Sequence, residues 1–154
     1  MVMLKGIPLL LTPELLYALA KMGHGDELVL ADANFPVSSI CKCGPMEVRA
    51  DSVRIPELLE AILKLFPLDS YVECPAAVMD LVEVDRQRGM VVPVWSCYTG
   101  LLIQAGSGGN VEKLERSAFY ERSKKAFAVV ATGETALYGN IIIKKGVIRP
   151  EELC

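Results

Sequence analysis

The chain has 154 residues, of which 52% are hydrophobic, and its 16 basic and 19 acidic residues give a formal net charge of −3. This length suits one domain with a core of ordinary size, so we expect residues 1–154 to form a single domain. The charges occur without long runs. This argues against a nucleic-acid surface, because such surfaces need clustered lysine and arginine.

The leucine-rich N-terminus does not have the pattern of a secretory or membrane segment. Pro8, Pro13 and Glu14 interrupt the apolar run, and no window reaches the roughly 18 apolar residues that a membrane span needs. Of the five cysteines, Cys41 and Cys43 are spaced C-x-C and have no partners nearby to complete a zinc site. We therefore expect no membrane contact, no metal, and free thiols in a reducing cytoplasm.

The first predicted helix spans residues 13–22. Thr12 is its expected N-cap and Pro13 its first-turn proline, and the apolar residues that follow fall on one helical face. Gly23 takes the position after the last turn, where a left-handed residue commonly closes a helix. Residues 27–31 then predict a short apolar strand.

Helices and strands are also predicted in the middle of the chain. A proline opens a second predicted helix over residues 55–66. Residues 76–84 alternate and are rich in β-branched side chains, so they predict a strand, followed by a loop over residues 85–89. Residues 93–106 have helical periodicity, and a Ser-Gly-Gly-Asn run ends that helix.

The final third of the chain has the clearest pattern. Ser117 is the expected cap of a helix over residues 118–126, and residues 127–134 predict a buried strand that runs into a Thr-Gly-Glu turn. A Tyr-Gly-Asn corner leads into another strand over residues 141–145. Because helices alternate with apolar strands, we predict an α/β fold with helices packed on a sheet.

His24 is the only histidine, and it lies between two glycines. Because the preceding helix ends near Met22, we expect the imidazole beside unpaired carbonyls at the negative end of the helix dipole. These carbonyls, with Asp26 and with Asp32 if it folds back, would hold the histidine pKa near or above its unperturbed value of about 6.5. Such a histidine can donate a proton at neutral pH. The alternative is a surface histidine that helps to cap the helix.

Other polar residues occur where strands and helices end. Asp32 and Asn34 follow a predicted strand, at the edge where α/β folds usually gather ligands, and Asp69 follows a helix. Asp and Asn also favour turns for their own hydrogen-bonding reasons, so both interpretations stay open for these three residues.

Tyrosine and asparagine side chains form another candidate group. Tyr120, Tyr138 and Asn140 suit sugar hydroxyls, because phenols and amides both donate and accept hydrogen bonds. Gly139 would let the backbone approach a ligand closely. Arg122 is interpreted as part of a solvated helix face. No dinucleotide, P-loop or nucleophile-elbow motif occurs, which leaves cofactor-free proton transfer or plain binding.

Three stretches, residues 10–36, 48–73 and 115–147, resemble the fucose mutarotase and ribose pyranase family. The blocks GHGD, FYERSKKAF and TGETALYGN together carry the resemblance, which covers nearly the whole chain and is greatest to animal members that act on L-fucose. The resemblance implies interconversion of the α and β anomers of the free sugar without a metal or cofactor. A D-ribose pyranase-type activity and a non-catalytic oligomeric monosaccharide-binding protein are the alternatives.

The resemblance also implies roles for individual residues. His24 matches the proton donor, and five residues match positions that hold the sugar: Asp32, Asp69, Tyr120, Tyr138 and Asn140. Family members have helices packed on a mixed sheet and form ring-shaped homo-oligomers, decamers in bacterial forms, with sites at subunit boundaries. Asn34 stands where some bacterial members have a second histidine, so the base that works with His24 stays open between Asp32 and a bound water.

Overall fold

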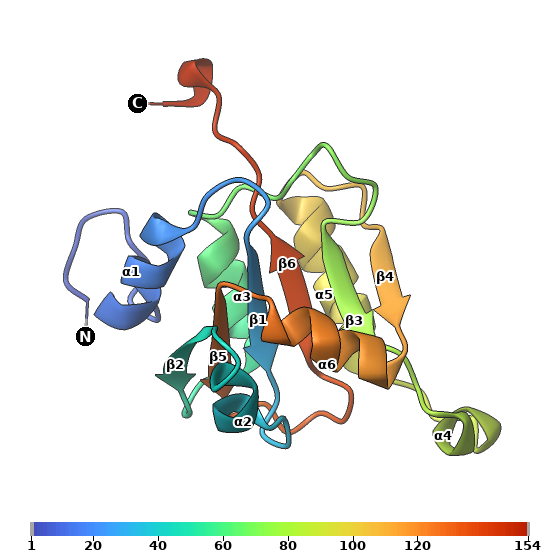
Figure 1. The fold of residues 1–154 in the computed structure, drawn as a ribbon. Coiled ribbons are helices and arrows are strands. Elements are labelled where there is room, and N and C mark those ends of the chain that lie inside the picture. The colour runs from blue at the N-terminus through green and yellow to red at the C-terminus, as the bar shows by residue number, and fades with distance from the viewer. Residues whose placement is uncertain (1, 154) are drawn as a thin grey trace.

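A computed structural model describes residues 2–153, which form a single α/β domain built on a six-stranded mixed sheet (Figure 1). The strands are β1 (Glu27–Ala31), β2 (Met46–Ala50), β3 (Ala76–Met79), β4 (Val111–Leu114), β5 (Ala128–Thr132) and β6 (Ile141–Lys144). The helices are α1 (Pro13–Lys21), α2 (Val37–Cys41), α3 (Ile55–Leu63), α4 (Glu83–Gln87), α5 (Pro93–Gln104), α6 (Arg116–Lys124) and the short 3-10 helix η1 (Pro150–Glu152). The predicted fold of helices packed on a mixed sheet is confirmed.

The strand order of the sheet is β2-β5-β1-β6-β3-β4. Strand β5 pairs in parallel with both β2 and β1, and β3 pairs in parallel with β4. Strand β6 runs antiparallel to its two neighbours β1 and β3, so it joins the two parallel groups into one sheet. The carboxyl end of β1 therefore lies beside the residues that lead into β6.

Helices cover both faces of the sheet, and the central strand β1 divides its side chains between two cores. Leu28 and Leu30 pack in the core that contains α1, α3 and α5, whereas Val29 and Ala31 pack against α2 and α6. Figure 1 shows α6 crossing the front of the sheet, with α3 and α5 behind it. All four residues are buried, as expected for a strand that is covered on both faces.

The predicted start of α1 is confirmed, but its predicted end is wrong. Thr12 Oγ1 accepts a hydrogen bond from the Leu15 N–H at 3.2 Å, as an N-cap does. At the other end the helix stops because Met22 is extended, with φ −66° and ψ 141°, and no left-handed glycine follows it. The Gly23 N–H instead donates to Asp26 Oδ2 at 2.7 Å.

Two further predictions are wrong for local reasons. The strand predicted over residues 76–84 ends at Met79, and α4 takes up part of the expected loop. Asp80 turns the chain there, because its carboxylate accepts the Leu81 N–H at 2.8 Å and pairs with Arg86. Helix α6 begins before Ser117, with Glu115 as the N-cap.

The sequence patterns did not indicate α2, β2 or β4, which are short elements of four or five residues. The strand predicted over residues 27–31 has its predicted bounds, and the other predicted helices and strands are present with ends shifted by at most three residues. No helix within residues 2–153 combines the length and apolar composition that crossing a membrane requires.

Candidate active site

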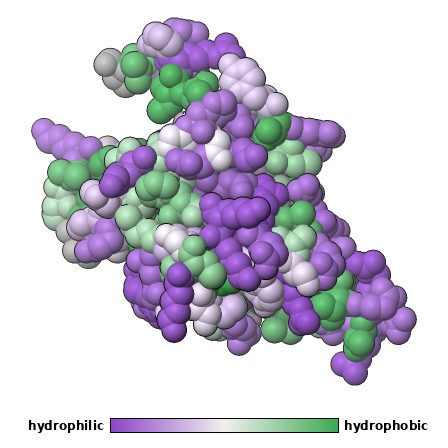
Figure 2. Space-filling model, viewed as in Figure 1, coloured by the Kyte–Doolittle hydropathy of each residue, from purple (hydrophilic) through white to green (hydrophobic). Residues whose placement is uncertain are grey.

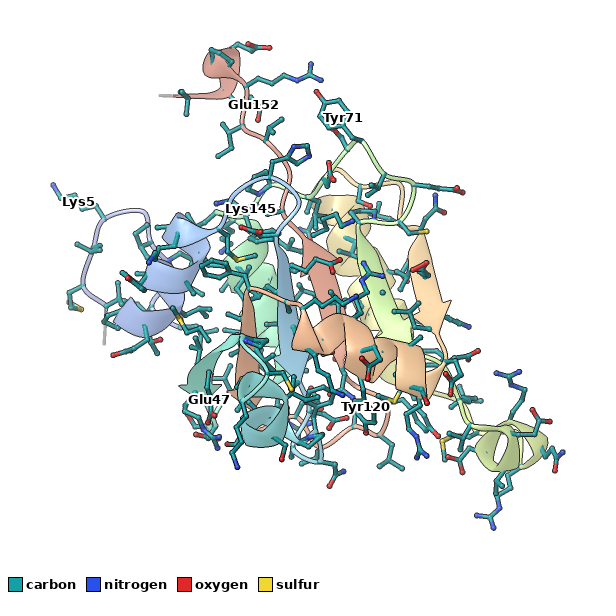
Figure 3. The ribbon with its side chains drawn as sticks, in the orientation of Figure 1. Lys5, Glu47, Tyr71, Tyr120, Lys145 and Glu152 are labelled. Carbon is teal, nitrogen blue, oxygen red and sulfur yellow. The ribbon has the colours of Figure 1, made fainter. Side chains whose placement is uncertain are left out.

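The predicted site residues lie in two groups at opposite ends of the sheet. One group is at the carboxyl end of β1: Asp32, Tyr120, Tyr138 and Asn140. The other group, His24 and Asp69, lies beyond the amino end of β1. The five residues of β1 span about 17 Å, at about 3.3 Å each. Figure 3 shows this separation, with Tyr120 at the bottom of the sheet and Tyr71, which follows Asp69 closely, at the top.

The first group lines a cavity of about 240 Å³. A space of this size can admit one monosaccharide. The remaining lining residues are Asn34, Phe35, Met79, Asp85, Arg116 and Leu137. The cavity thus combines carboxylates, phenols, an amide and a guanidinium with a few apolar side chains, a composition that suits a polyhydroxylated ligand.

Asp32 is the buried carboxyl group of this cavity, with 6% of its surface exposed. One carboxylate oxygen accepts the Asn34 N–H at 3.0 Å, and the Asp32 N–H donates to Asn140 Oδ1 at 2.7 Å. Burial raises the pKa of Asp32, and the nearby Glu134 carboxylate raises it further, while backbone hydrogen bonds oppose the change. Asp32 therefore holds a proton more readily than an ordinary aspartate.

The Tyr138 corner brings a strained tyrosine into the cavity. Tyr138 has φ +59°, a left-handed conformation that is uncommon for a bulky residue. Its hydroxyl donates to Asp85 Oδ2 at 2.5 Å, while its backbone oxygen accepts the Trp95 indole N–H at 3.1 Å. The buried Tyr98 hydroxyl donates to the Gly139 oxygen at 2.6 Å. These bonds fix the corner, as strained residues at functional sites require.

Gly139 is required by the packing of the corner. A Cβ atom at this position would lie 2.9 Å from the Ala136 oxygen and 3.2 Å from Glu134 Cγ. A side chain would therefore force the backbone of the corner apart.

At the opposite end, His24 pairs with Asp69. The distance from His24 Nε2 to Asp69 Oδ1 is 3.1 Å, and the same oxygen accepts the Tyr71 N–H at 3.1 Å. Because a carboxylate only accepts hydrogen bonds, Nε2 carries the proton in this contact, and Nδ1 is left for proton transfer. The histidine side chain is 47% exposed, whereas Asp69 is buried. The Tyr71 ring lies beside the imidazole, with 5.6 Å between ring centroids.

The surroundings predicted for His24 are wrong in two respects. The carbonyl groups at the end of α1 are covered by Lys145, whose ammonium donates to the oxygens of Leu19 at 2.9 Å and Met22 at 2.6 Å. Asp32 does not fold back toward the imidazole, because β1 lies between them. The carboxylate partner of His24 is Asp69, 45 residues away in the sequence.

The interpretation of Arg122 as a solvated surface residue is also wrong. Its guanidinium is 22% exposed and pairs with Glu27 of β1 and, at 3.0 Å, with Glu112 of β4. The hydrogen bonds that Arg122 donates to the Glu27 carboxylate raise the pKa of Arg122. This ion-pair network ties α6 to the sheet.

Among Trp95, Phe119 and Tyr120, Tyr120 is the residue that lines the cavity. Phe119 is fully buried in the core, and the Trp95 indole is bonded to the backbone of the Tyr138 corner. The sequence patterns also missed Asp85 and Arg116, which line the cavity, and Glu134 behind it. Among residues 2–153, no three His, Cys, Asp or Glu side chains gather as a metal site requires.

Residues 5–148 match the model of the RbsD / FucU transport protein family. The chain belongs to this family. The fucose mutarotase of Danio rerio is 75% identical over 154 residues, which cover all of both chains. The fucose mutarotase of Homo sapiens is 68% identical over 148 residues, 96% of each chain.

Solved structures of the RbsD / FucU family have the same fold. The fucose mutarotase of Streptococcus pneumoniae in complex with L-fucose is 49% identical, with a TM-score of 0.87 over 95% of this chain and 100% of that chain. RbsD of Bacillus subtilis complexed with D-ribose has a TM-score of 0.70 over 96% of this chain and 100% of its own. At 22% identity, this second likeness establishes the fold alone.

Proposed function

We propose that this chain interconverts the α and β anomers of L-fucose. The observation that carries the proposal is the match to a structure of a fucose mutarotase in complex with L-fucose, at 49% identity over 95% of this chain. The full-length vertebrate relatives named fucose mutarotase support the same activity. The cavity beside Asp32 has the size and the polar groups that this substrate needs.

The reaction requires one proton to be given and one to be taken. A base removes the proton of the anomeric hydroxyl while an acid protonates the ring oxygen, and the ring opens to the aldehyde. The two transfers reverse when the ring closes on the other face of the carbonyl. We assign the acid role to His24, through Nδ1, because Asp69 holds its other nitrogen. Asp32 or a water bound to it takes the second proton.

In this proposal the sugar is held by the cavity group together with Asp69. Asn140 uses its oxygen on the Asp32 N–H, so its amide N–H groups are the ones it offers to a sugar oxygen. Tyr138 donates its hydroxyl proton to Asp85, and its oxygen accepts the Val82 N–H at 3.3 Å, so one remaining lone pair of that oxygen is what it offers to a sugar hydroxyl. Arg116 adds donors to the same wall.

A site that needs both His24 and Asp32 has to be shared between copies of the chain. The two residues lie at opposite ends of β1, about 17 Å apart along the strand, and a single sugar cannot bridge that distance. If the end that carries His24 packs against the cavity end of a neighbouring copy, each contact completes one site. Head-to-tail contacts of this kind close into a ring when the rotation from copy to copy closes, and form an open filament when it does not. A shared site supports a homo-oligomer, and the family resemblance implies that it is ring-shaped, with a decamer as the expected size.

Exposed apolar side chains support self-association. Met3, Leu4 and Leu9 are each more than half exposed, and Figure 2 shows hydrophobic side chains gathered at the N-terminal segment on the left of the view. Such clusters usually mark contact surfaces. A cytoplasmic location stays a prediction.

The first test measures anomer exchange of L-fucose by NMR magnetisation transfer, with the intact protein and with His24→Gln. Glutamine can still donate a hydrogen bond to Asp69, but it cannot transfer a proton, so exchange should fall by about 10²-fold or more while fucose still binds. Lys21→Gln, at an exposed position near the end of α1, is the matched control and should keep full activity. Unchanged exchange with His24→Gln would refute the acid role. An intact protein that binds fucose without speeding exchange would be a binding protein instead.

The same assay tests the shared site when two inactive variants are mixed. His24→Gln damages the group at one end of the sheet, and Asn140→Ala damages the cavity at the other end. Mixed oligomers formed by co-expression pair an intact His24 end with an intact cavity, so part of the exchange activity should return. A site formed within one chain would give no recovery, because each copy would carry one damaged part.

A further inference from the structure

Glu134 is a buried acid behind the cavity, with 3% of its surface exposed. It follows β5 in the Thr-Gly-Glu turn, and backbone N–H groups bind both of its carboxylate oxygens. The Ile55 N–H donates to Oε1 at 3.1 Å, and the Ala136 N–H donates to Oε2 at 3.0 Å. Ile55 is the first residue of α3, so the carboxylate satisfies an amide that a helix start leaves unpaired.

The same residue also contacts both segments that carry the sugar-holding side chains. Its backbone oxygen accepts the Ala33 N–H at 2.7 Å, directly after Asp32. On the other side, a Cβ atom on Gly139 would lie 3.2 Å from Glu134 Cγ and 3.6 Å from Asp32 Cβ. Glu134 thus lies between the turn that holds Asp32 and the corner that holds Tyr138.

The charge of Glu134 acts on the cavity as well. The amino end of the nine-residue helix α3 favours an anion at this position. Burial is the largest cause of the raised pKa of Asp32, and the negative charge of Glu134 is a further cause. The other titratable groups around Asp32 come from several elements: Arg49 of β2 and Asp51 after it, Asp85 of α4, Tyr98 of α5, Arg116 and Tyr120 of α6, and Tyr138 of the corner.

We propose that Glu134 is a positioning residue for the mutarotase reaction: its carboxylate ties the turn before the Tyr138 corner to the start of α3, and its backbone oxygen holds Ala33, next to Asp32. This inference rests on the proposed function. It extends that function to a residue that does not touch the sugar and that acts through Asp32 and Tyr138.

The test compares Glu134→Gln with Glu57→Gln. Glutamine keeps an oxygen for Ile55 but turns an NH₂ group toward the Ala136 N–H, so one bond and the charge are lost. Glu57 lies in the first turn of α3, is exposed, and lines no part of the cavity, so its variant removes a charge from the same helix end. Both proteins are checked by thermal unfolding, so that exchange is measured below their transitions.

With Glu134→Gln, we expect the KM for L-fucose to rise about tenfold. The limb of the pH–rate profile that follows Asp32 should move to lower pH, because a negative charge beside that carboxyl group is gone. Glu57→Gln should change neither quantity. A folded Glu134→Gln variant with the KM and pH profile of the intact protein would overturn the proposal, and so would equal effects from Glu57→Gln.

A second measurement needs no variant, in case Glu134→Gln does not fold. Hydrogen exchange of the Ile55 and Ala136 amides reports the two bonds of the carboxylate directly. Saturating L-fucose should slow both amides several-fold, and unchanged exchange would count against the proposal. If the intact protein binds fucose but does not speed its mutarotation, the proposed function fails, while fucose affinity and amide exchange still decide the role of Glu134.

Discussion

The Tyr98 hydroxyl offers the sharpest test of how the fold holds the cavity. Tyr98 is fully buried in α5, and its hydroxyl donates to the Gly139 oxygen at 2.6 Å. Burial raises the pKa of this phenol far above its ordinary value, so it stays a donor at every pH at which the protein is folded. Replacing Tyr98 by phenylalanine removes one oxygen atom and leaves the ring in place.

The expected magnitude follows from the bond that is lost. A buried carbonyl without its donor costs about 1–3 kcal/mol, so we expect a loss of about 2 kcal/mol in the free energy of unfolding. For a domain of this size, that corresponds to a fall in Tm of about 4–8 °C. The left-handed conformation of Tyr138 costs a similar amount, about 1–3 kcal/mol. Weakening the adjacent tether should therefore loosen the corner and reduce fucose affinity.

Urea unfolding and fucose titration of Tyr98→Phe measure both effects. Tyr17→Phe is the matched control, because Tyr17 is 55% exposed and the same atom is removed without loss of a buried bond. A Tyr98→Phe variant within 0.5 kcal/mol of the intact protein, with unchanged fucose affinity, would refute the view that this hydroxyl holds the corner.

Two further predictions concern Asp32 and Lys145. The unfolded pKa of Asp32 is 3.8 and its folded pKa is higher, so the stability gained from its proton is present below pH 3.8 and lost as the pH rises through the folded value. Asp32→Asn should then be more stable than the intact protein in urea at pH 7, although inactive in exchange; lower stability at that pH would contradict the assignment. Lys145→Met should lower the free energy of unfolding by about 1–2 kcal/mol, because the carbonyls of Leu19 and Met22 lose their donor, whereas Lys144→Met should have little effect.

The sequence predicted elements whose signals are local. The start of α1 follows from Thr12 and Pro13, and β1 and β5 follow from continuous apolar runs. Strand β2 gave no such signal, because it lies at the edge of the sheet and forms by pairing with β5, about 80 residues later. The alternating pattern of residues 76–84 was misleading, because a turn at Asp80 ends the strand at Met79. The alternation of apolar residues continues through that turn and therefore does not indicate it.

The resemblance names the candidate site residues one by one, but it does not give their arrangement. The contact of His24 with Asp69 depends on the order of strands in the sheet, since the Asp69 N–H donates to the Lys144 oxygen at the end of β6. Glu134 looked like one residue of a turn, and only its burial and its bond to Ile55 give it a role.

The length of β1 explains why the candidate site residues are divided between the two ends of the sheet. The five residues of β1 place the segments before and after the strand at opposite ends of the sheet. His24 and Asp32 cannot meet within one copy unless that strand breaks. In the proposed homo-oligomer, a neighbouring copy would supply the missing end. The proposed acid and the cavity would then each be held by one end of a sheet, and the contact between copies would set their separation. In this view, a change at that contact alters catalysis even when every site residue is intact.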